Sequence, residues 1–249
     1  MNSKTSDTLV DILAIGAHPD DVELACGGTL ALAAEQGRRV GILHLTRGEA
    51  GTRGTGEERE KEARAAAQAL GALTVDFLDC GDGGLRRGPE EEDALIEKIR
   101  LRRPEIVLGP APEDRHPDHG RAYRLVKDAC FYAGLRRRAP GRGEPHRPGL
   151  VLSYMQHDAV FEPTLVMDVS AAWQRKIDAL ACYDSQLYRG AGTRDEPQTK
   201  IASREYALSV EGRARHFGQL VGAELGEPLW SRIPLAVADL MHLMPPGLR

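Results

Sequence analysis

The chain has 249 residues, with 33 Lys and Arg against 37 Asp and Glu, which gives a formal net charge of −4. Its composition, 41% hydrophobic and 28% charged, is typical of a folded globular protein and excludes a disordered chain. Without a basic excess we expect no nucleic-acid partner. No apolar run approaches the roughly 20 residues of a membrane span. Residues 1–7 contain no apolar leader segment, and the widely spaced cysteines favour buried thiols, so we expect a cytoplasmic protein.

Short apolar runs alternate with amphipathic segments along the first half of the chain. In order, this pattern predicts strand 10–17, helix 27–36, strand 39–45, helix 57–70, strand 73–78, helix 90–103, strand 105–109 and helix 120–133. An Arg-rich stretch at 136–149 follows, which is interpreted as a solvated surface loop rather than an anion site. Beyond it we expect strands 149–155 and 164–169 and helices 171–183 and 203–221.

This alternation predicts an α/β fold with a Rossmann-like, mostly parallel sheet and helices on both faces. Right-handed crossovers return each helix across the sheet, which produces that arrangement. Because sites in such sheets form beyond the carboxyl ends of the strands, the loops that follow the first four strands should be neighbours. No repeat or linker interrupts the pattern, so a single domain is expected over 1–249.

Two short runs combine imidazoles with carboxylates directly after predicted strands, AHPDD at 17–21 and RHPDH at 115–119. One such run alone is usually a capped turn beside a surface histidine. Two runs on adjacent strand ends favour a shared metal site, because Zn²⁺ binds His nitrogen and carboxylate oxygen. A catalytic zinc site needs three protein ligands and an open position. Such a set can be drawn from His18, Asp21, His116 and His119.

The first run, within AHPDDVELACGGTL (17–30), and RHPDH closely resemble the LmbE-like or PIG-L-like zinc deacetylases, which remove N-acetyl groups from glucosamine-containing substrates. The resemblance covers most of the chain, through TRGEAGTRGT (46–55), LDCGDGGL (78–85), SQLY (185–188) and GEPLWSRIPLAVADL (226–240). The TRGEAGTRGT and GEPLWSRIPLAVADL motifs are similar to those of the bacillithiol-biosynthesis branch, whose substrate is N-acetylglucosaminyl-malate. It implies a metal-dependent N-deacetylase with one zinc ion per chain, although other divalent transition metals can fill such sites.

The resemblance also implies roles for individual residues. It implies zinc ligation by His18, Asp21 and His119. Asp20 would be the general base, and His116 would stabilise the tetrahedral oxyanion together with the metal. Asp118 is expected to orient His116 and to favour its protonated form.

Substrate contacts are expected from neighbouring strand-end loops. Arg53 and Asp82 match positions that hold the sugar in this family. A planar guanidinium, from Arg53 or Arg115, suits a malate carboxylate. Tyr188 is a candidate lid residue. The alternative interpretation of these four residues is surface ion pairing and turn capping.

Three other features carry less information. His44 lies in an apolar strand and is expected to be a core histidine. His157 and Asp158 follow a predicted strand and could either reach the site or form a turn. The Gly27–Gly28 pair lacks a phosphate-binding motif, so no nucleotide cofactor is expected.

Other functions compete with deacetylation of the malate conjugate. A chitin-type disaccharide or a thiol-conjugate amide would use the same metal machinery, which does not report the sugar's anomeric substituent. A non-catalytic sugar-binding protein agrees less well with an open metal site beside a free base. We therefore expect a small-molecule glycoside as the partner, and the resemblance suggests a homo-oligomer, a hexamer.

Overall fold

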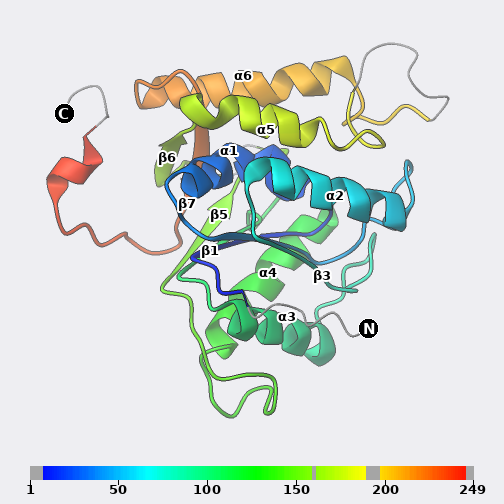
Figure 1. Cartoon of the computed structure of the whole chain (residues 1–249), viewed down its shortest axis with the longest axis vertical. Coiled ribbons are helices and arrows are strands. Elements are labelled where there is room, and N and C mark those ends of the chain that lie inside the picture. Colours follow the sequence, from blue (N-terminus) through cyan, green and yellow to red (C-terminus); the bar gives the residue numbers. More distant parts are fainter. Residues whose placement is uncertain (1–7, 159–160, 189–196, 245–249) are drawn as a thin grey trace.

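The computed structural model describes residues 8–158, 161–188 and 197–244. A seven-stranded sheet with the strand order β3-β2-β1-β4-β5-β7-β6 runs through the molecule (Figure 1). The strands are β1 (Ile12–Gly16), β2 (Val40–His44), β3 (Thr74–Phe77), β4 (Ile106–Gly109), β5 (Leu150–Tyr154), β6 (Leu165–Asp168) and β7 (Gly226–Trp230). The strands from β3 to β5 are parallel, whereas β7 runs antiparallel to both β5 and β6.

Helices cover both faces of this sheet (Figure 1). One side carries α1 (Asp21–Glu35), α2 (Gly56–Leu70), α5 (Trp173–Leu180) and α6 (Arg204–Leu220). The other side carries α3 (Pro89–Arg102) and α4 (Pro117–Tyr132). Short 3₁₀ turns occupy Ser170–Ala172 and Leu240–Leu243. The predicted α/β class, a mostly parallel sheet between helical layers, is confirmed.

The strand at the centre of the sheet is buried on both faces. Leu13 and Ile15 of β1 pack into the core cluster that includes residues of α3 and α4. Ala14 points the other way, into the cluster that includes residues of α1 and α2. This alternation explains why the strand appears in the sequence as a continuous apolar run.

The sequence-based prediction missed β7, and it placed the start of α1 at residue 27. Gly226 and Pro228 disfavour a strand when they are considered locally, but pairing with β5 and β6 supplies the ladder. The helix α1 begins at Asp21 and is interrupted at Cys26, where φ is −136° and ψ is 20°. The expected start therefore coincides with an internal break of the helix.

The cysteine thiols are free in the described chain, and Cys26, Cys80 and Cys130 are buried, as expected. Cys182 is partly exposed. Among the described residues there is no helix of the length and hydrophobicity needed to cross a membrane.

The Arg-rich loop at 136–149 packs against α3. Arg100 of α3 is buried, and its guanidinium donates hydrogen bonds of 2.8–2.9 Å to the carbonyl oxygens of Ala133, Leu135, Arg138 and Ala139. Two arginines of the loop pair with acids of the same helix, Arg138 with Glu92 and Asp93, and Arg142 with Glu97. Arg138 and Arg142 therefore offset acidic charge of α3, which supports the interpretation of a surface loop.

We predict that Arg100→Met destabilises the protein. The substitution keeps an apolar stem but leaves carbonyl groups of the loop without their charged donor, which should lower the free energy of unfolding by about 2–4 kcal/mol. Urea unfolding measures this difference. The exposed Arg137 is the matched control, and Arg137→Met should change stability by less than about 0.5 kcal/mol. Equal effects of the two substitutions would contradict the role given to Arg100.

Candidate metal centre and substrate cleft

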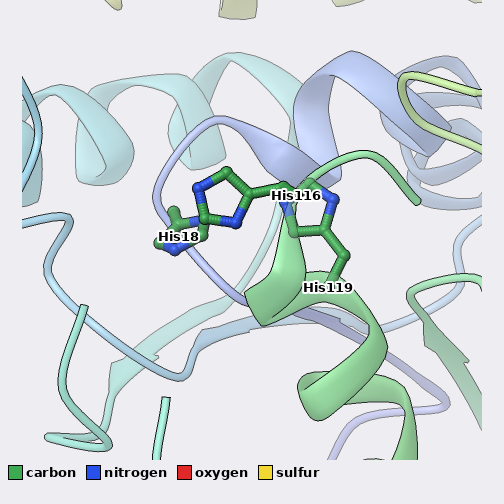
Figure 2. Close-up of side chains that lie close together, drawn as sticks. All are labelled: His18, His116 and His119. Atoms are coloured by element: carbon green, nitrogen blue, oxygen red, sulfur yellow. The ribbon is translucent and has the colours of Figure 1, made fainter. Parts of the chain in front are cut away.

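Three imidazoles meet where β1 and β4 end. His18 lies in the turn after β1, whereas His116 and His119 lie at the start of α4, after β4 (Figure 2). Their ring centroids are 4.7 Å apart for His18 and His116, 5.6 Å for His18 and His119, and 5.0 Å for His116 and His119. The parallel pairing of β1 with β4 brings the two motifs together.

The Asp21 carboxylate lies between two of these rings. Its Oδ2 atom is 3.5 Å from His18 Nδ1, and its Oδ1 atom is 3.4 Å from His119 Nε2. Ligand atoms bound at 2.0–2.1 Å to a tetrahedral ion are about 3.3 Å apart, so both contacts match the spacing of metal ligands. These three side chains are buried. One ring nitrogen from each of His18, His116 and His119 also lies within 4.8 Å of the other two, so these three imidazoles form a second possible ligand set.

His18 and His119 each turn their second ring nitrogen toward a carboxylate. His18 Nε2 is 3.0 Å from Asp82 Oδ1 and 3.4 Å from Asp118 Oδ2. His119 Nδ1 is 3.1 Å from Asp114 Oδ1. Carboxylates in this position fix the tautomer and orientation of metal-binding histidines. The donor set of His18, Asp21 and His119 therefore fits a divalent transition metal.

The electrostatics of this cluster also favour a cation. Burial opposes protonation of His119, but Asp21 and Asp114 raise its pKa to about 9. Burial works against ionisation of Asp21 too, yet His119 and His18 hold its pKa well below the usual range. The carboxylates thus stabilise positive charge on the ring nitrogens. A metal ion would displace these protons on binding, because ligands must be deprotonated.

Asp20 adjoins the cluster in a strained backbone conformation. Its φ of 100° lies in the left-handed region, which is costly for a residue other than glycine and is common at functional sites. Arg59 of α2 supports the turn, since it donates to the carbonyl oxygen of Pro19 at 2.6 Å and lies 3.4 Å from the Asp20 carboxylate. Burial raises the pKa of Asp20 to about 7, although Arg59 opposes the shift. A carboxyl group with that pKa suits a general base at neutral pH.

The carboxylate of Asp118 holds the loop after β3 against His18. It accepts hydrogen bonds from the backbone N–H groups of Gly83 (2.9 Å) and Leu85 (3.0 Å) and from Arg121 (2.7 Å). It also lies 3.4 Å from His18 Nε2. The carboxylate of Asp118 therefore orients His18, whereas the expected contact with His116 is made by the backbone N–H of Asp118.

His116 is the N-cap of α4, and its Nδ1 atom accepts a hydrogen bond from the backbone N–H of Asp118 (3.3 Å). That bond places the proton of the neutral ring on Nε2. Burial and the charges of His18 and His119 lower the pKa of His116. The charges of Asp21 and Asp118 oppose this shift, as expected for Asp118, but burial and the two other histidines outweigh them.

A cleft of about 370 Å³ opens over the cluster. Its lining includes the candidate metal ligands, Asp20 and His116, together with the expected substrate residues Arg53, Asp82 and Arg115. Asp82 is partly engaged already, since its other oxygen accepts from the backbone N–H of Ala50 at 2.8 Å. Tyr188 instead lines a neighbouring apolar cavity of about 250 Å³ between α5 and α6. The structure thus places the expected lid residue outside the lining of the cleft.

Sequence reasoning missed Asp114 and Gln156 and left His157 open. Gln156 is buried and donates to Asp21 Oδ1 at 2.5 Å. His157 lines the cleft and stacks on His119, with ring centroids 5.5 Å apart. Their positions were visible in the sequence: Asp114 directly precedes RHPDH, and Gln156 and His157 directly follow the strand predicted at 149–155. Nothing in a single sequence showed which way these side chains point.

His44 is a buried core residue, as expected, and it also supports the turn that carries His18. Its Nδ1 atom donates to the carbonyl oxygen of His18 at 3.1 Å. Burial lowers the pKa of His44 to about 4, so the ring stays neutral and keeps this donor.

A mostly parallel α/β sheet with a buried His–Asp–His cluster at its strand ends fits the class of metal-dependent enzymes. The model of the PIG-L family, described as GlcNAc-PI de-N-acetylase, matches residues 13–130. The chain is 31% identical to diacetylchitobiose deacetylase of Thermococcus kodakarensis, over 78% of this chain and 77% of that protein. The conserved protein TT1542 from Thermus thermophilus superposes with a TM-score of 0.83 at 36% identity, over 93% of this chain and 99% of that one.

Two further relatives are named for different activities. A probable N-acetyl-α-D-glucosaminyl L-malate deacetylase 2 of Bacillus cereus is 28% identical over 70% of this chain and 83% of that protein. A 4-oxalmesaconate hydratase of Pseudomonas putida is 29% identical over 70% of this chain and 73% of that protein. These similarities establish that the chain belongs to the PIG-L family. The predicted membership of a metal-dependent deacetylase family is thereby confirmed.

We predict that Asp114→Asn weakens metal binding. The substitution keeps the size of the side chain but removes the negative charge beside His119 Nδ1, and loss of such a partner lowers metal affinity by roughly 10–100-fold. Competition with a chromogenic chelator measures the affinity for Zn²⁺. Asp79→Asn, at an exposed loop position, is the control and should bind zinc like the wild type. Unchanged affinity of Asp114→Asn would show that this carboxylate does not support the site.

Proposed function

We propose that the protein uses zinc to hydrolyse the N-acetyl amide of an N-acetylglucosamine conjugate. The observation that carries this proposal is the buried Asp20 carboxylate next to the cluster of His18, Asp21 and His119. A structural metal site would be closed by four ligands and would need no free base. The chemistry that bound zinc supplies is polarisation of the amide carbonyl and a fall in the pKa of water from about 15.7 to about 7.

The residues of this chain divide the proton transfers and the charge stabilisation. Asp20, with its pKa near neutrality, accepts a proton from the attacking water and can return it to the departing amine. His116 has its Nδ1 atom occupied by the N–H of Asp118, so its Nε2–H is the donor available to the oxyanion. His116 acts in this proposal as a neutral hydrogen-bond donor, because burial and neighbouring charges lower its pKa.

Charge in the cleft supports an anionic substituent on the sugar. Arg53, Arg115 and Lys200 all line the cleft. Malate carries two carboxylates, whereas diacetylchitobiose is neutral, so these cations favour the malate conjugate. We therefore propose N-acetylglucosaminyl-malate as the substrate.

The SQLY run supports the loop that carries Arg53. Gln186 donates to the carbonyl oxygen of Arg53 at 2.5 Å, and the hydroxyl of Ser185 donates to Glu62 at 2.7 Å. Gly54 has a φ of 68°, and a Cβ atom there would lie 2.6 Å from the Ser185 hydroxyl. This loop can therefore pack only with glycine at 54, which places Arg53 at the cleft.

Three alternative substrates should be assayed beside N-acetylglucosaminyl-malate, because relatives or the sequence analysis suggest their activities. Diacetylchitobiose and a thiol-conjugate amide test the deacetylase and amidase alternatives, and 4-oxalmesaconate tests hydration. The proposed substrate requires the largest kcat/KM for N-acetylglucosaminyl-malate. Preference for the disaccharide would replace the malate proposal, and sugar binding without any turnover would favour a binding protein.

We predict that Asp20→Asn abolishes most of the activity without releasing the metal. Loss of a general base typically lowers kcat by about 10²–10⁴-fold. Free amine released from N-acetylglucosaminyl-malate reports the rate, and elemental analysis reports the zinc content. A variant that keeps zinc and more than about a tenth of the wild-type kcat would exclude Asp20 as the base.

We predict that Lys200→Met selectively impairs the anionic substrate. Removal of a cation that lines the cleft should raise KM for the malate conjugate by about 5–20-fold, with little change for diacetylchitobiose. Steady-state kinetics with both substrates measure the difference. Lys127→Met, which lies outside this cleft, is the matched control and should leave both KM values unchanged. Equal effects on the two substrates would argue against recognition of the malate carboxylates.

A further inference from the structure

The helix that begins with Asp21 is divided into two segments. At Cys26 the backbone leaves the helical region, with φ −136° and ψ 20°. A break of this kind removes hydrogen-bond partners from carbonyl groups before it and from N–H groups after it. The residues around the break are buried, so water does not replace the lost partners.

A buried ion pair satisfies both sides of the break. Glu227 of β7 accepts hydrogen bonds from the backbone N–H groups of Gly28 (3.0 Å) and Thr29 (2.7 Å), and from the Thr29 hydroxyl (2.6 Å). Lys176 of α5 donates to the carbonyl oxygen of Leu24 at 2.9 Å. The two charged groups are 2.6 Å apart, and their side chains are 3% and 2% exposed.

The two charges have the signs that the broken helix requires. The carboxylate of Glu227 faces the start of the second segment, and the ammonium of Lys176 faces the end of the first. These are the ends at which a helix dipole favours negative and positive charge, respectively. An apolar pair could fill the same space, but it would leave the freed backbone groups without partners.

The first segment of the helix is short and carries the catalytic turn. The N–H of Leu24 donates to the carbonyl oxygen of Asp20 at 2.9 Å, so one turn connects Asp20 to Leu24. Lys176 holds the far end of that turn. A displacement of Leu24 would therefore move Asp21 relative to His119, which is fixed separately on α4.

We propose that Lys176 and Glu227 are positioning residues for the metal centre, because they set the angle of the first segment of α1 and thereby the place of Asp21. This inference rests on the proposed metal site. Neither side chain lines the cleft, so both act on the site through the backbone of α1.

The test measures Zn²⁺ affinity by chelator competition in the absence of substrate, on variants that circular dichroism shows to be folded. Glu227→Gln and Lys176→Met should each weaken zinc binding by about tenfold or more. Arg102→Met is the matched control, because Arg102 pairs with Asp76 at 2.8 Å with similarly low exposure, 5% and 7%, outside the cleft. It should bind zinc within about twofold of the wild type. Amide hydrogen exchange should accelerate at 20–29 in the first two variants alone.

Two outcomes overturn the positioning role: folded Glu227→Gln that binds zinc like the wild type, or an equal loss in Arg102→Met. Should Lys176→Met and Glu227→Gln fail to fold, Thr29→Val decides. It removes only the hydroxyl bond to Glu227 and should weaken zinc binding by about two- to fivefold; unchanged affinity overturns the proposal. Wild-type protein that binds no zinc would instead overturn the metal site itself.

Discussion

The contact of one carboxylate, that of Asp21, with two imidazoles from different strand ends is the constraint on which this site depends. His18 and His119 each approach a different oxygen of Asp21, and each has a further carboxylate on its outer nitrogen. So much buried negative charge is stable only beside compensating positive charge. A divalent ion bound by this cluster would supply that charge.

The turn that carries these groups is held by polar contacts from several elements. His44 of β2 binds the carbonyl oxygen of His18, and Arg59 of α2 binds that of Pro19. Lys176 of α5 holds the end of the same helical turn at Leu24. A non-glycine residue keeps a φ near 100° only when its surroundings fix the backbone. These contacts explain how Asp20 keeps that conformation.

Local patterns predicted the parts of this protein that depend on neighbours in the sequence. Apolar runs indicated β1, β2 and β4 because strands buried on both faces are mostly apolar along their whole length. The strand β7 escaped prediction because Gly226 and Pro228 disfavour a strand locally, and its pairing partners β5 and β6 lie far away in the sequence. Asp118 was expected beside His116, but its carboxylate turns toward His18 and the loop after β3, a contact that spacing along α4 does not reveal.

The sequence by itself determined the α/β class, the two His–Asp motifs and their meeting at the carboxyl ends of parallel strands. These follow from the period of apolar residues and from the handedness of crossovers, which act through the local chain. Only the tertiary structure decided that Asp114 contacts His119, that Gln156 donates to Asp21, that His157 lines the cleft and Tyr188 does not, and that a buried ion pair spans the break in α1. Side-chain direction depends on packing between distant segments, and one sequence does not encode it in any local pattern.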